Sequence, residues 1–284
     1  MIVYNHYEGR PSVSLFAGPT GSGKTQIWRA LQQEYGSQNI IIQDASVLSA
    51  EGWRGGNKIS TIFRSLNADQ RERIILVLDE CDKLLEPMYG ANGTNYSDLM
   101  QNQLLRMCDH DTLFFGSEDS QSSMTISCAR VSVVMLGAFA RLTEQKRKDS
   151  SCIGFGRNPE FFQNSVTELT TEDLIDYVMR AELAGWLDRI VCMDLLSIRD
   201  LVQIGKQEVT RLEEQLHIRL RIAPDVLIML ARAAVGKGLG ARWLKARLGQ
   251  LLDDRLYDDP DADSYEILYE PADADARRQA CCMD

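Results

Sequence analysis

Apolar and polar positions follow two different patterns along the first two thirds of the chain. Short apolar runs rich in Val, Ile and Leu predict β-strands, whereas apolar residues that recur every three or four positions predict helices. The predicted strands are Val13–Ala17, Asn39–Gln43, Ile74–Asp79, Val131–Leu136 and Arg189–Met193. The predicted helices are Gln26–Tyr35, Lys58–Leu66 and Tyr96–Met107. This alternation predicts an α/β fold whose parallel sheet has helices on both faces.

The pattern becomes mostly helical after about residue 196. Helices are predicted at Ser197–Gln215, at Ala223–Ala234 and from Gly240 to Leu256, followed by a short strand at Tyr265–Tyr269. We therefore predict a large domain at 1–195 and a small helical domain at 196–270. Residues 271–284 have charged and small side chains but little apolar content, so we expect a disordered tail there.

The composition excludes several classes of protein. With 284 residues, 44% of them apolar and 25% charged, the chain can bury a sizeable core. The formal charge of −10 argues against a mainly electrostatic nucleic-acid binder. No apolar run approaches the roughly 20 residues of a membrane helix, and the first residues lack a signal-peptide pattern. We therefore expect a cytoplasmic protein without a membrane partner.

Zinc is not expected to bind this chain. The seven cysteines form no C-x-x-C pair, and the three histidines are far apart in the sequence. Because structural zinc sites need closely spaced Cys and His ligands, the cysteines are interpreted as reduced thiols.

The strongest motif for chemistry is GPTGSGKT, a phosphate-binding loop (Walker A) between a predicted strand and a predicted helix. It comprises Gly18, Pro19, Thr20, Gly21, Ser22, Gly23, Lys24 and Thr25. Backbone N–H groups of such a loop surround phosphate oxygens, and the helix N-terminus adds positive potential. Lys24 would reach the β- and γ-phosphates, and the Thr25 hydroxyl would hold Mg²⁺. The motif predicts ATP and Mg²⁺ binding.

A second motif, LDE, ends the predicted strand Ile74–Asp79. Asp79 is placed to bind Mg²⁺, and Glu80 is placed to polarise the attacking water. The adjacent Asp-Glu pair favours an ATPase over a small-molecule kinase, which needs no acid there to activate water. Acids that are simply solvated at the end of a strand are the alternative interpretation.

Seven sequence pieces, taken in order, resemble those of the ClpX-type AAA+ ATPases of the Clp/Hsp100 unfoldase family. They are VYNHY at 3–7, GPTGSGKT, GWRG at 52–55, LDECDK at 78–83, GAFARL at 137–142, IGFG at 153–156 and GAR at 240–242. The resemblance implies an AAA+ P-loop NTPase fold, a five-stranded parallel αβα sandwich followed by a small helical domain. It also implies a homo-oligomeric ring, a hexamer in the family, that hydrolyses ATP to unfold or remodel polypeptides. A ClpP-type peptidase is the partner that the resemblance implies.

Two residues match positions of known role in that family. Trp53 matches the aromatic residue of the first pore loop, which grips substrate polypeptide in the ring channel, although Arg54 replaces an aliphatic residue. A Trp that packs locally in a Gly-rich turn is the alternative. Arg242 matches the second sensor, which would bind the γ-phosphate and couple nucleotide state to domain movement. A solvated helix arginine is the alternative there.

The arginine that acts on a neighbouring subunit's nucleotide is not clearly matched. An ungapped alignment places the family's arginine at Trp186, and Arg189 follows three residues later. Arg189 either reaches the neighbour's γ-phosphate or is a structural residue at the start of a strand. Because a missing arginine finger removes much transition-state stabilisation, weak hydrolysis is expected if Arg189 does not serve.

The IGFG segment occupies the place of the family's peptidase-docking loop. Ile153, Gly154 and Phe155 would fill apolar clefts on the partner, a weak contact that is repeated around a ring. The alternative is a loop folded back on its own domain, with Phe155 packed near Phe161 and Phe162.

The resemblance also leaves the start of the chain and the activity open. The family's zinc module and the first part of its AAA+ domain have no counterpart before VYNHY, so the chain is interpreted either as a truncated reading frame or as a shortened paralogue. Tyr4 and Asn5 are the remaining candidates for adenine contacts. A nucleotide-binding regulatory or scaffold subunit with little hydrolysis is the second functional hypothesis.

Overall fold

The computed structural model describes residues 1–49, 57–71, 73–89, 93, 95–115, 124–151 and 168–268. The chain divides into two compact units by its internal contacts. The first unit comprises Met1–Pro19 and Lys24–Asp194, and the second comprises Thr20–Gly23 and Leu195–Asp284. Each unit is described separately below.

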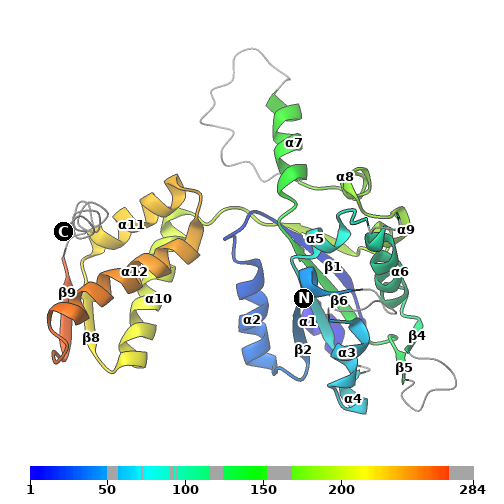
Figure 1. Ribbon diagram of the computed structural model, residues 1–284, viewed down its shortest axis with the longest axis horizontal. Helices are drawn as coiled ribbons and strands as arrows, with labels where there is room; N and C mark the ends of the chain where they lie inside the picture. Colours follow the sequence, from blue (N-terminus) through cyan, green and yellow to red (C-terminus); the bar gives the residue numbers. More distant parts are fainter. Residues whose placement is uncertain are drawn as a thin grey trace. The chain divides into compact units, whose positions relative to one another are not determined.

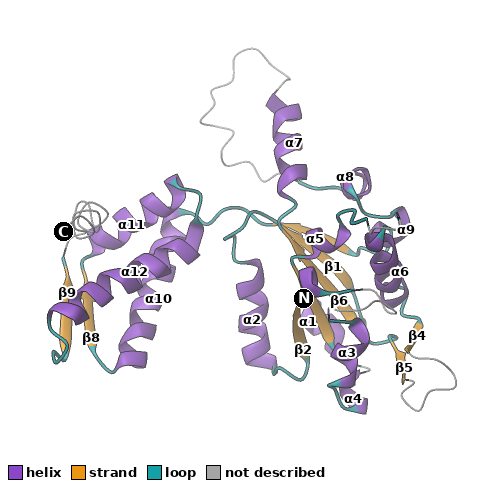
Figure 2. Ribbon diagram, viewed as in Figure 1, coloured by secondary structure: helices purple, strands orange, loops and turns teal. Residues whose placement is uncertain are grey.

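The first unit is built on a five-stranded parallel sheet with the strand order β2-β3-β6-β1-β7 (Figure 2). The strands are β1 (Val13–Ala17), β2 (Ile40–Asp44), β3 (Ile75–Asp79), β6 (Ser132–Gly137) and β7 (Arg189–Cys192). All five strands predicted from the apolar runs are confirmed, and their bounds shift by at most one residue. The parallel αβα fold class predicted from the sequence is therefore correct.

Helices cover both faces of this sheet (Figure 1). On one face, Val3 of α1 (Ile2–Tyr7) and Trp28 of α2 (Lys24–Tyr35) pack against alternate strand residues such as Val77. The intervening strand residues, such as Leu78, pack with helices on the opposite face. These helices are α3 (Ile59–Arg64), α5 (Cys81–Leu85) and α6 (Tyr96–Cys108). Burial of both faces explains why IILVL has no polar position.

Several short elements complete the first unit and were not predicted from the sequence. They are η1 (Ala45–Val47), α4 (Ala68–Arg71), the antiparallel pair β4 (Thr112–Phe115) and β5 (Met124–Ser127), α7 (Ala140–Ser151), α8 (Thr171–Tyr177) and α9 (Ala181–Ala184). Most are too short to show a clear apolar period. α8 does begin with a capping box, in which Thr170 and Asp173 hydrogen-bond to each other's backbone N–H groups.

The second unit packs three helices around an apolar core. They are α10 (Ile198–Leu216), α11 (Pro224–Gly236) and α12 (Gly240–Asp258), close to the bounds predicted from the sequence. Two short strands, β8 (Arg219–Ile222) and β9 (Ser264–Ile267), pair in parallel. β9 overlaps the predicted strand Tyr265–Tyr269, whereas β8, a strand of four residues, was not predicted.

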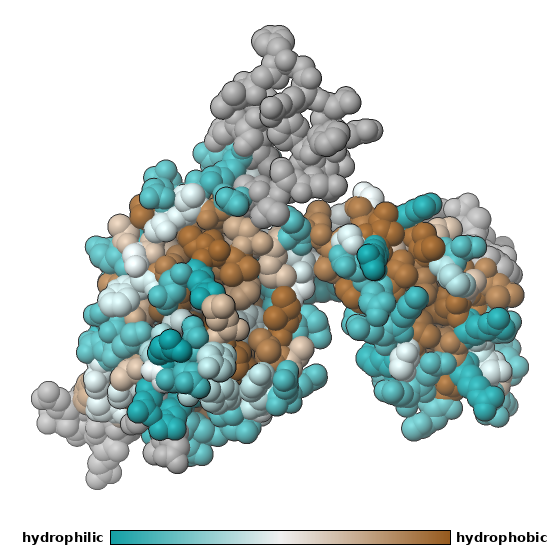
Figure 3. Space-filling model, turned by 180° about the vertical axis from the view of Figure 1, so that it is seen from behind, coloured by the Kyte–Doolittle hydropathy of each residue, from teal (hydrophilic) through white to brown (hydrophobic). Residues whose placement is uncertain are grey.

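Apolar side chains also remain on the surface of both units, among hydrophilic ones (Figure 3). In the second unit, Met229 and Val235 of α11 and Leu239 beyond it are 42%, 42% and 49% exposed. No described helix combines the length and the apolar content that a membrane crossing requires.

Candidate functional site

The predicted phosphate loop joins the end of β1 to the start of α2. Within it, Gly21 and Gly23 have positive φ angles of 86° and 92°, which glycine adopts without steric cost. Gly18 approaches β7 so closely that an added Cβ would lie 2.4 Å from the carbonyl oxygen of Met193. The loop backbone therefore needs glycine at its first position for packing, independently of any phosphate.

Lys24 lies at the first turn of α2 and is 9% exposed. Its Nζ donates hydrogen bonds to the carbonyl oxygens of Gly18 (2.6 Å) and Pro19 (3.0 Å). Burial lowers the pKa of Lys24, and the negative charges of Asp82, Asp79 and Glu80 act in the opposite direction. The ammonium group is thus held inside the curve of the loop, close to three carboxylates.

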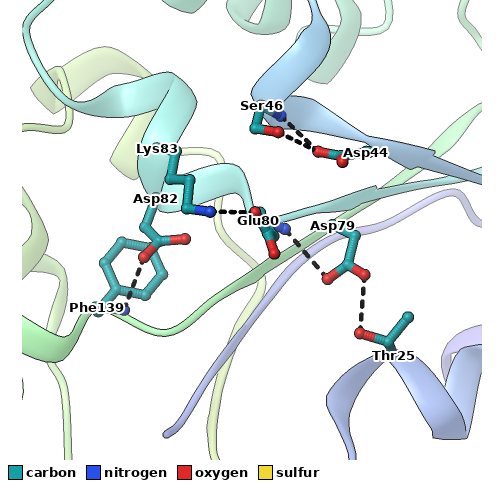
Figure 4. Close-up of polar contacts among 8 residues, drawn as sticks. All are labelled: Thr25, Asp44, Ser46, Asp79, Glu80, Asp82, Lys83 and Phe139. Atoms are coloured by element: carbon teal, nitrogen blue, oxygen red, sulfur yellow. Dashed lines mark hydrogen bonds and ion pairs between the residues drawn. The ribbon is translucent and has the colours of Figure 1, made fainter. Parts of the chain in front are cut away.

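Thr25 and Asp79, the two predicted Mg²⁺ ligands, are in direct contact. The Thr25 hydroxyl donates a hydrogen bond of 2.8 Å to Oδ2 of Asp79, which ends β3 (Figure 4). A hydroxyl and a carboxylate oxygen are hard ligands, and Mg²⁺ usually combines few protein oxygens with phosphate oxygens and water. The pair fits that requirement. No group of three or more His, Cys, Asp or Glu side chains suited to a metal occurs within the described ranges.

Glu80 follows Asp79 and precedes α5. Its backbone lies in the left-handed region with φ 58°, and its N–H donates to Oδ1 of Asp79 at 3.1 Å. The Glu80 carboxylate forms an ion pair with Lys83 one helical turn further on (Figure 4). The Glu80 side chain is half exposed, so a water molecule can reach it. Because Glu80 follows Asp79 directly, it also lies near the Thr25–Asp79 pair.

The geometry adds Asp82, a residue to which the sequence analysis assigned no role. It lies on α5 with its Oδ2 3.2 Å from the backbone nitrogen of Phe139, which donates to it (Figure 4). It also exerts the largest favourable electrostatic effect of the three acids on charged Lys24. The residue stands in the quoted run LDECDK, but only the fold reveals which backbone group it meets.

The two arginines predicted to act on nucleotide, Arg189 and Arg242, lie on other elements than the residues described above. Arg189 begins β7 and is exposed, with its Nη2 donating to the Met1 sulfur at 2.9 Å. Trp186, just before it, is 39% exposed, and its ring meets His110 edge to face. Arg242 is exposed in the first turn of α12, in the second unit. Their roles stay predictions.

Two further predicted sites lie outside the described residues. They are Trp53 of the GWRG segment, together with its neighbour Arg54, and Ile153, Gly154 and Phe155 of the IGFG segment. The predicted disordered tail at 271–284 also lies outside them.

Comparison with known proteins supports the geometry. Residues 14–146 match the family model described as "ATPase family associated with various cellular activities (AAA)", a span that runs from β1 into α7. The chain is also similar to the protein named "ATP-dependent Clp protease ATP-binding subunit ClpX" from Borrelia duttonii, Borrelia recurrentis and Treponema denticola.

The relative from Borrelia duttonii is 28% identical over 297 residues, covering 91% of this chain and 68% of the relative. The relative from Treponema denticola is 24% identical over 296 residues, covering 91% of this chain and 71% of the relative. Both alignments extend well beyond the AAA match, so they include the second unit's residues. The chain binds nucleotide and is an ATPase with an AAA match at residues 14–146, and over 91% of its length it is similar to AAA+ proteins of the ClpX type.

Proposed function

We propose that this ATPase uses hydrolysis to unfold or remodel polypeptides in the cytoplasm. The observation that carries the proposal is the direct contact between Thr25 and Asp79, with Glu80 following Asp79 at the same edge of the sheet. This arrangement suits metal-assisted phosphoryl transfer to water, because one edge supplies two metal ligands and an acid for the nucleophile. ATP hydrolysis then supplies the free energy for moving a substrate chain.

Each residue of the site has a distinct task in this proposal. The Lys24 ammonium binds the β- and γ-phosphates in place of the carbonyl oxygens of Gly18 and Pro19. Thr25 and Asp79 would hold Mg²⁺, which would supply positive charge against the charge of the phosphates. The Glu80 carboxylate polarises the attacking water, and this requires it to turn away from its ion pair with Lys83. An exposed pair of this kind is weak, so its rupture costs little.

The proposals on assembly and substrate handling rest on sequence matches and on the similarity to known proteins. We assign Arg242 to sensing of the γ-phosphate, Arg189 to contact with a neighbour's nucleotide, and Trp53 to the grip on substrate. The similarity to ClpX-type proteins supports a ring of identical subunits, a hexamer in this proposal. The matched relatives' name, a Clp protease subunit, supports a ClpP-type peptidase as partner.

The site assignment is tested by ATP turnover as a function of protein concentration. Turnover per subunit should rise as subunits associate, and Glu80→Gln should abolish it while ATP stays bound, because the metal ligands remain. Glu34→Gln, an exposed acid on α2, is the matched control and should keep wild-type turnover. Unchanged phosphate release in Glu80→Gln contradicts the assignment of the hydrolytic acid.

Substrate unfolding is tested with a stable fluorescent protein that carries an unstructured peptide tail. ATP should cause loss of its fluorescence, and Trp53→Ala should slow this loss while leaving basal ATP turnover intact. With a ClpP-type peptidase added, replacing Ile153 and Phe155 by Ala should abolish degradation alone. ATP turnover without any loss of fluorescence contradicts the unfolding proposal.

A regulatory or scaffold subunit is the second candidate, and the observation that favours it is Trp186. An exposed aromatic ring occupies the position where the resemblance places the finger arginine. ATP binding without turnover at every protein concentration supports this candidate against the first.

A further inference from the structure

The turn that follows β6 has an unusual backbone. Phe139 has a φ of 45°, in the left-handed region that bulky residues rarely adopt, and its side chain is 1% exposed. Such a conformation persists only where the surrounding structure holds it in place. The contacts of Phe139 therefore show which residues stabilise this left-handed backbone.

Three of the contacts of Phe139 lie on the side of the turn that faces α5, Gly137 and α8. Its N–H donates a hydrogen bond of 3.2 Å to Oδ2 of Asp82 on α5 (Figure 4). Its ring covers Gly137 so closely that a Cβ there would lie 2.4 Å from the ring atom Cε2. The ring also meets Tyr177 of α8 edge to face, with 6.2 Å between the centroids. The turn is thus held by one carboxylate and by the packing of the Phe139 ring against Gly137 and Tyr177.

The same turn supports the nucleotide site. The N–H of Gly18, at the start of the phosphate loop, donates a hydrogen bond of 3.2 Å to the carbonyl oxygen of Gly137. Asp82 lies two residues after Glu80, in the first turn of α5. A hydrogen bond between Asp82 and Phe139 therefore joins the helix that begins after Glu80 to the strand end that supports the phosphate loop.

We propose that Asp82 is a positioning residue for ATP hydrolysis. Its carboxylate fastens the Gly137–Phe139 turn to α5 and so keeps Glu80 and the phosphate loop at a constant separation. Small displacements of a reacting group slow the chemical step far more than they weaken substrate binding. This inference rests on the proposed function, because it assumes that Glu80 and Lys24 serve the hydrolysis reaction.

Asp82 also has an electrostatic effect that can be separated from its hydrogen bond. Asp82 is one of three acids, with Asp79 and Glu80, whose negative charges act on the Lys24 ammonium. An asparagine at position 82 keeps an oxygen that accepts from Phe139 but removes the charge. An alanine removes both. Comparing the two variants therefore separates the effect of the hydrogen bond on catalysis from the effect of the charge.

The experiment measures kcat and the KM for ATP of the full chain with each variant. Asp82→Ala should lower kcat at least about tenfold, whereas Asp82→Asn should stay within about threefold of the wild type. Any change in KM should be similar in the two variants, because both remove the same charge near Lys24. Asp98→Ala, an exposed acid in the first turn of α6, is the matched control and should change neither constant.

Equal kcat values for the Ala and Asn variants overturn the proposal, whether both are high or both are low. If Asp82→Ala does not fold, Gly137→Ala disturbs the same turn from its other side, because the new methyl group collides with the Phe139 ring. This variant should also lower kcat, and adding Phe139→Ala should restore part of it. A double variant no faster than Gly137→Ala contradicts the proposed fit.

Glu80→Gln separates this inference from the proposed function. If Glu80→Gln leaves turnover unchanged, the proposed site is wrong and the Asp82 proposal falls with it. If Glu80→Gln abolishes turnover but Asp82→Ala keeps the wild-type kcat, the site assignment stands and only the positioning role of Asp82 is contradicted.

Discussion

The hydroxyl of Thr25 donates a 2.8 Å hydrogen bond to the carboxylate of Asp79, across 54 positions of sequence. This contact places the two proposed Mg²⁺ ligands side by side. Thr25→Val keeps the shape of the side chain but removes the hydroxyl, so the Mg²⁺ concentration for half-maximal ATP turnover should rise about tenfold or more.

Thr25→Ser is the matched control, because it keeps the hydroxyl and should stay close to the wild-type Mg²⁺ requirement. The measurement is ATP turnover titrated with Mg²⁺ at fixed ATP. A Val variant with the Mg²⁺ dependence of the wild type contradicts the metal role of Thr25.

Gly18→Ala should weaken nucleotide binding through the backbone rather than through a lost contact. The new methyl group would lie 2.4 Å from the Met193 carbonyl oxygen, which belongs to the backbone after β7 and cannot turn aside. The phosphate loop must therefore shift, and we expect the Kd for ATP, measured by calorimetry, to rise about tenfold or more.

Gly249→Ala provides the control for this substitution. No atom lies within 4 Å of the added Cβ, and Gly249 is inside α12, where Ala is favoured over Gly by about 0.5–1 kcal/mol. This variant should melt at a slightly higher temperature and bind ATP like the wild type. Equal ATP binding by both variants contradicts the close approach at Gly18.

The stability of the first unit should fall in mildly acidic solution because of His6. Its Nε2–H donates to the carbonyl oxygen of Arg73 (3.1 Å), and its Nδ1 accepts from the Ser132 hydroxyl (2.9 Å). The Ser132 oxygen also accepts from the N–H of Ser12, and a proton on Nδ1 would leave the Ser132 hydroxyl hydrogen without its acceptor.

Burial lowers the pKa of His6, and its hydrogen bond to Arg73 only partly opposes this. The unfolded chain therefore binds a proton at a higher pH than the folded one. The contribution of His6 to stability should be constant above the ordinary histidine pKa of about 6.5 and decrease as the pH falls from there towards the lower folded pKa. Melting temperatures between pH 8 and pH 5.5 measure this decrease.

His6→Gln removes the titrating group, so its melting temperature should depend less on pH over that window. His217→Asn is the control, since His217 is exposed at the end of α10 and Asn tolerates its φ of 56°. If His6→Gln keeps the full acid-induced loss, the destabilisation has another origin.

Glu208 should stabilise the second unit by joining two of its helices. Its side chain, only 5% exposed, accepts hydrogen bonds from Arg211 on the same helix and pairs with Lys245 of α12 at 3.1 Å. Burial alone would raise the pKa of Glu208, but the bonds to Arg211 and Lys245 more than offset this and lower it. The carboxylate is thus charged and paired inside the unit.

Glu208→Ala should cost about 1–2 kcal/mol, below the usual cost of breaking a buried pair, because both cations are about half exposed and solvent screens them. Hydrogen–deuterium exchange should accelerate in α10 and α12 and stay unchanged in the sheet of the first unit. Glu214→Ala, an exposed residue of α10, should have no such effect. Unchanged exchange in α12 with Glu208→Ala contradicts the link.

Much of the fold was predictable from the sequence because the signals are local. A strand covered on both faces needs apolar side chains at successive positions, as IILVL has, and the long helices of the second unit carry a clear apolar period. The short pair β8 and β9 was only half predicted, since strands of four residues form chiefly because a partner strand is available.

Part of the candidate site was likewise predictable from the sequence, and part was visible only in the tertiary structure. The order of glycines, Lys24 and Thr25 after a strand, and of Asp79 and Glu80 at the end of another, was enough to predict which residues meet phosphate and metal, and those roles stay predictions. Parallel strands end at one edge of a sheet, so these motifs meet without further information. Only the tertiary structure decided that Asp82 holds the backbone of Phe139 and that Gly137 must lack a side chain. A hydrogen bond to a left-handed backbone 57 residues away depends on how α5 packs against the end of β6, and no local pattern of residues encodes that packing.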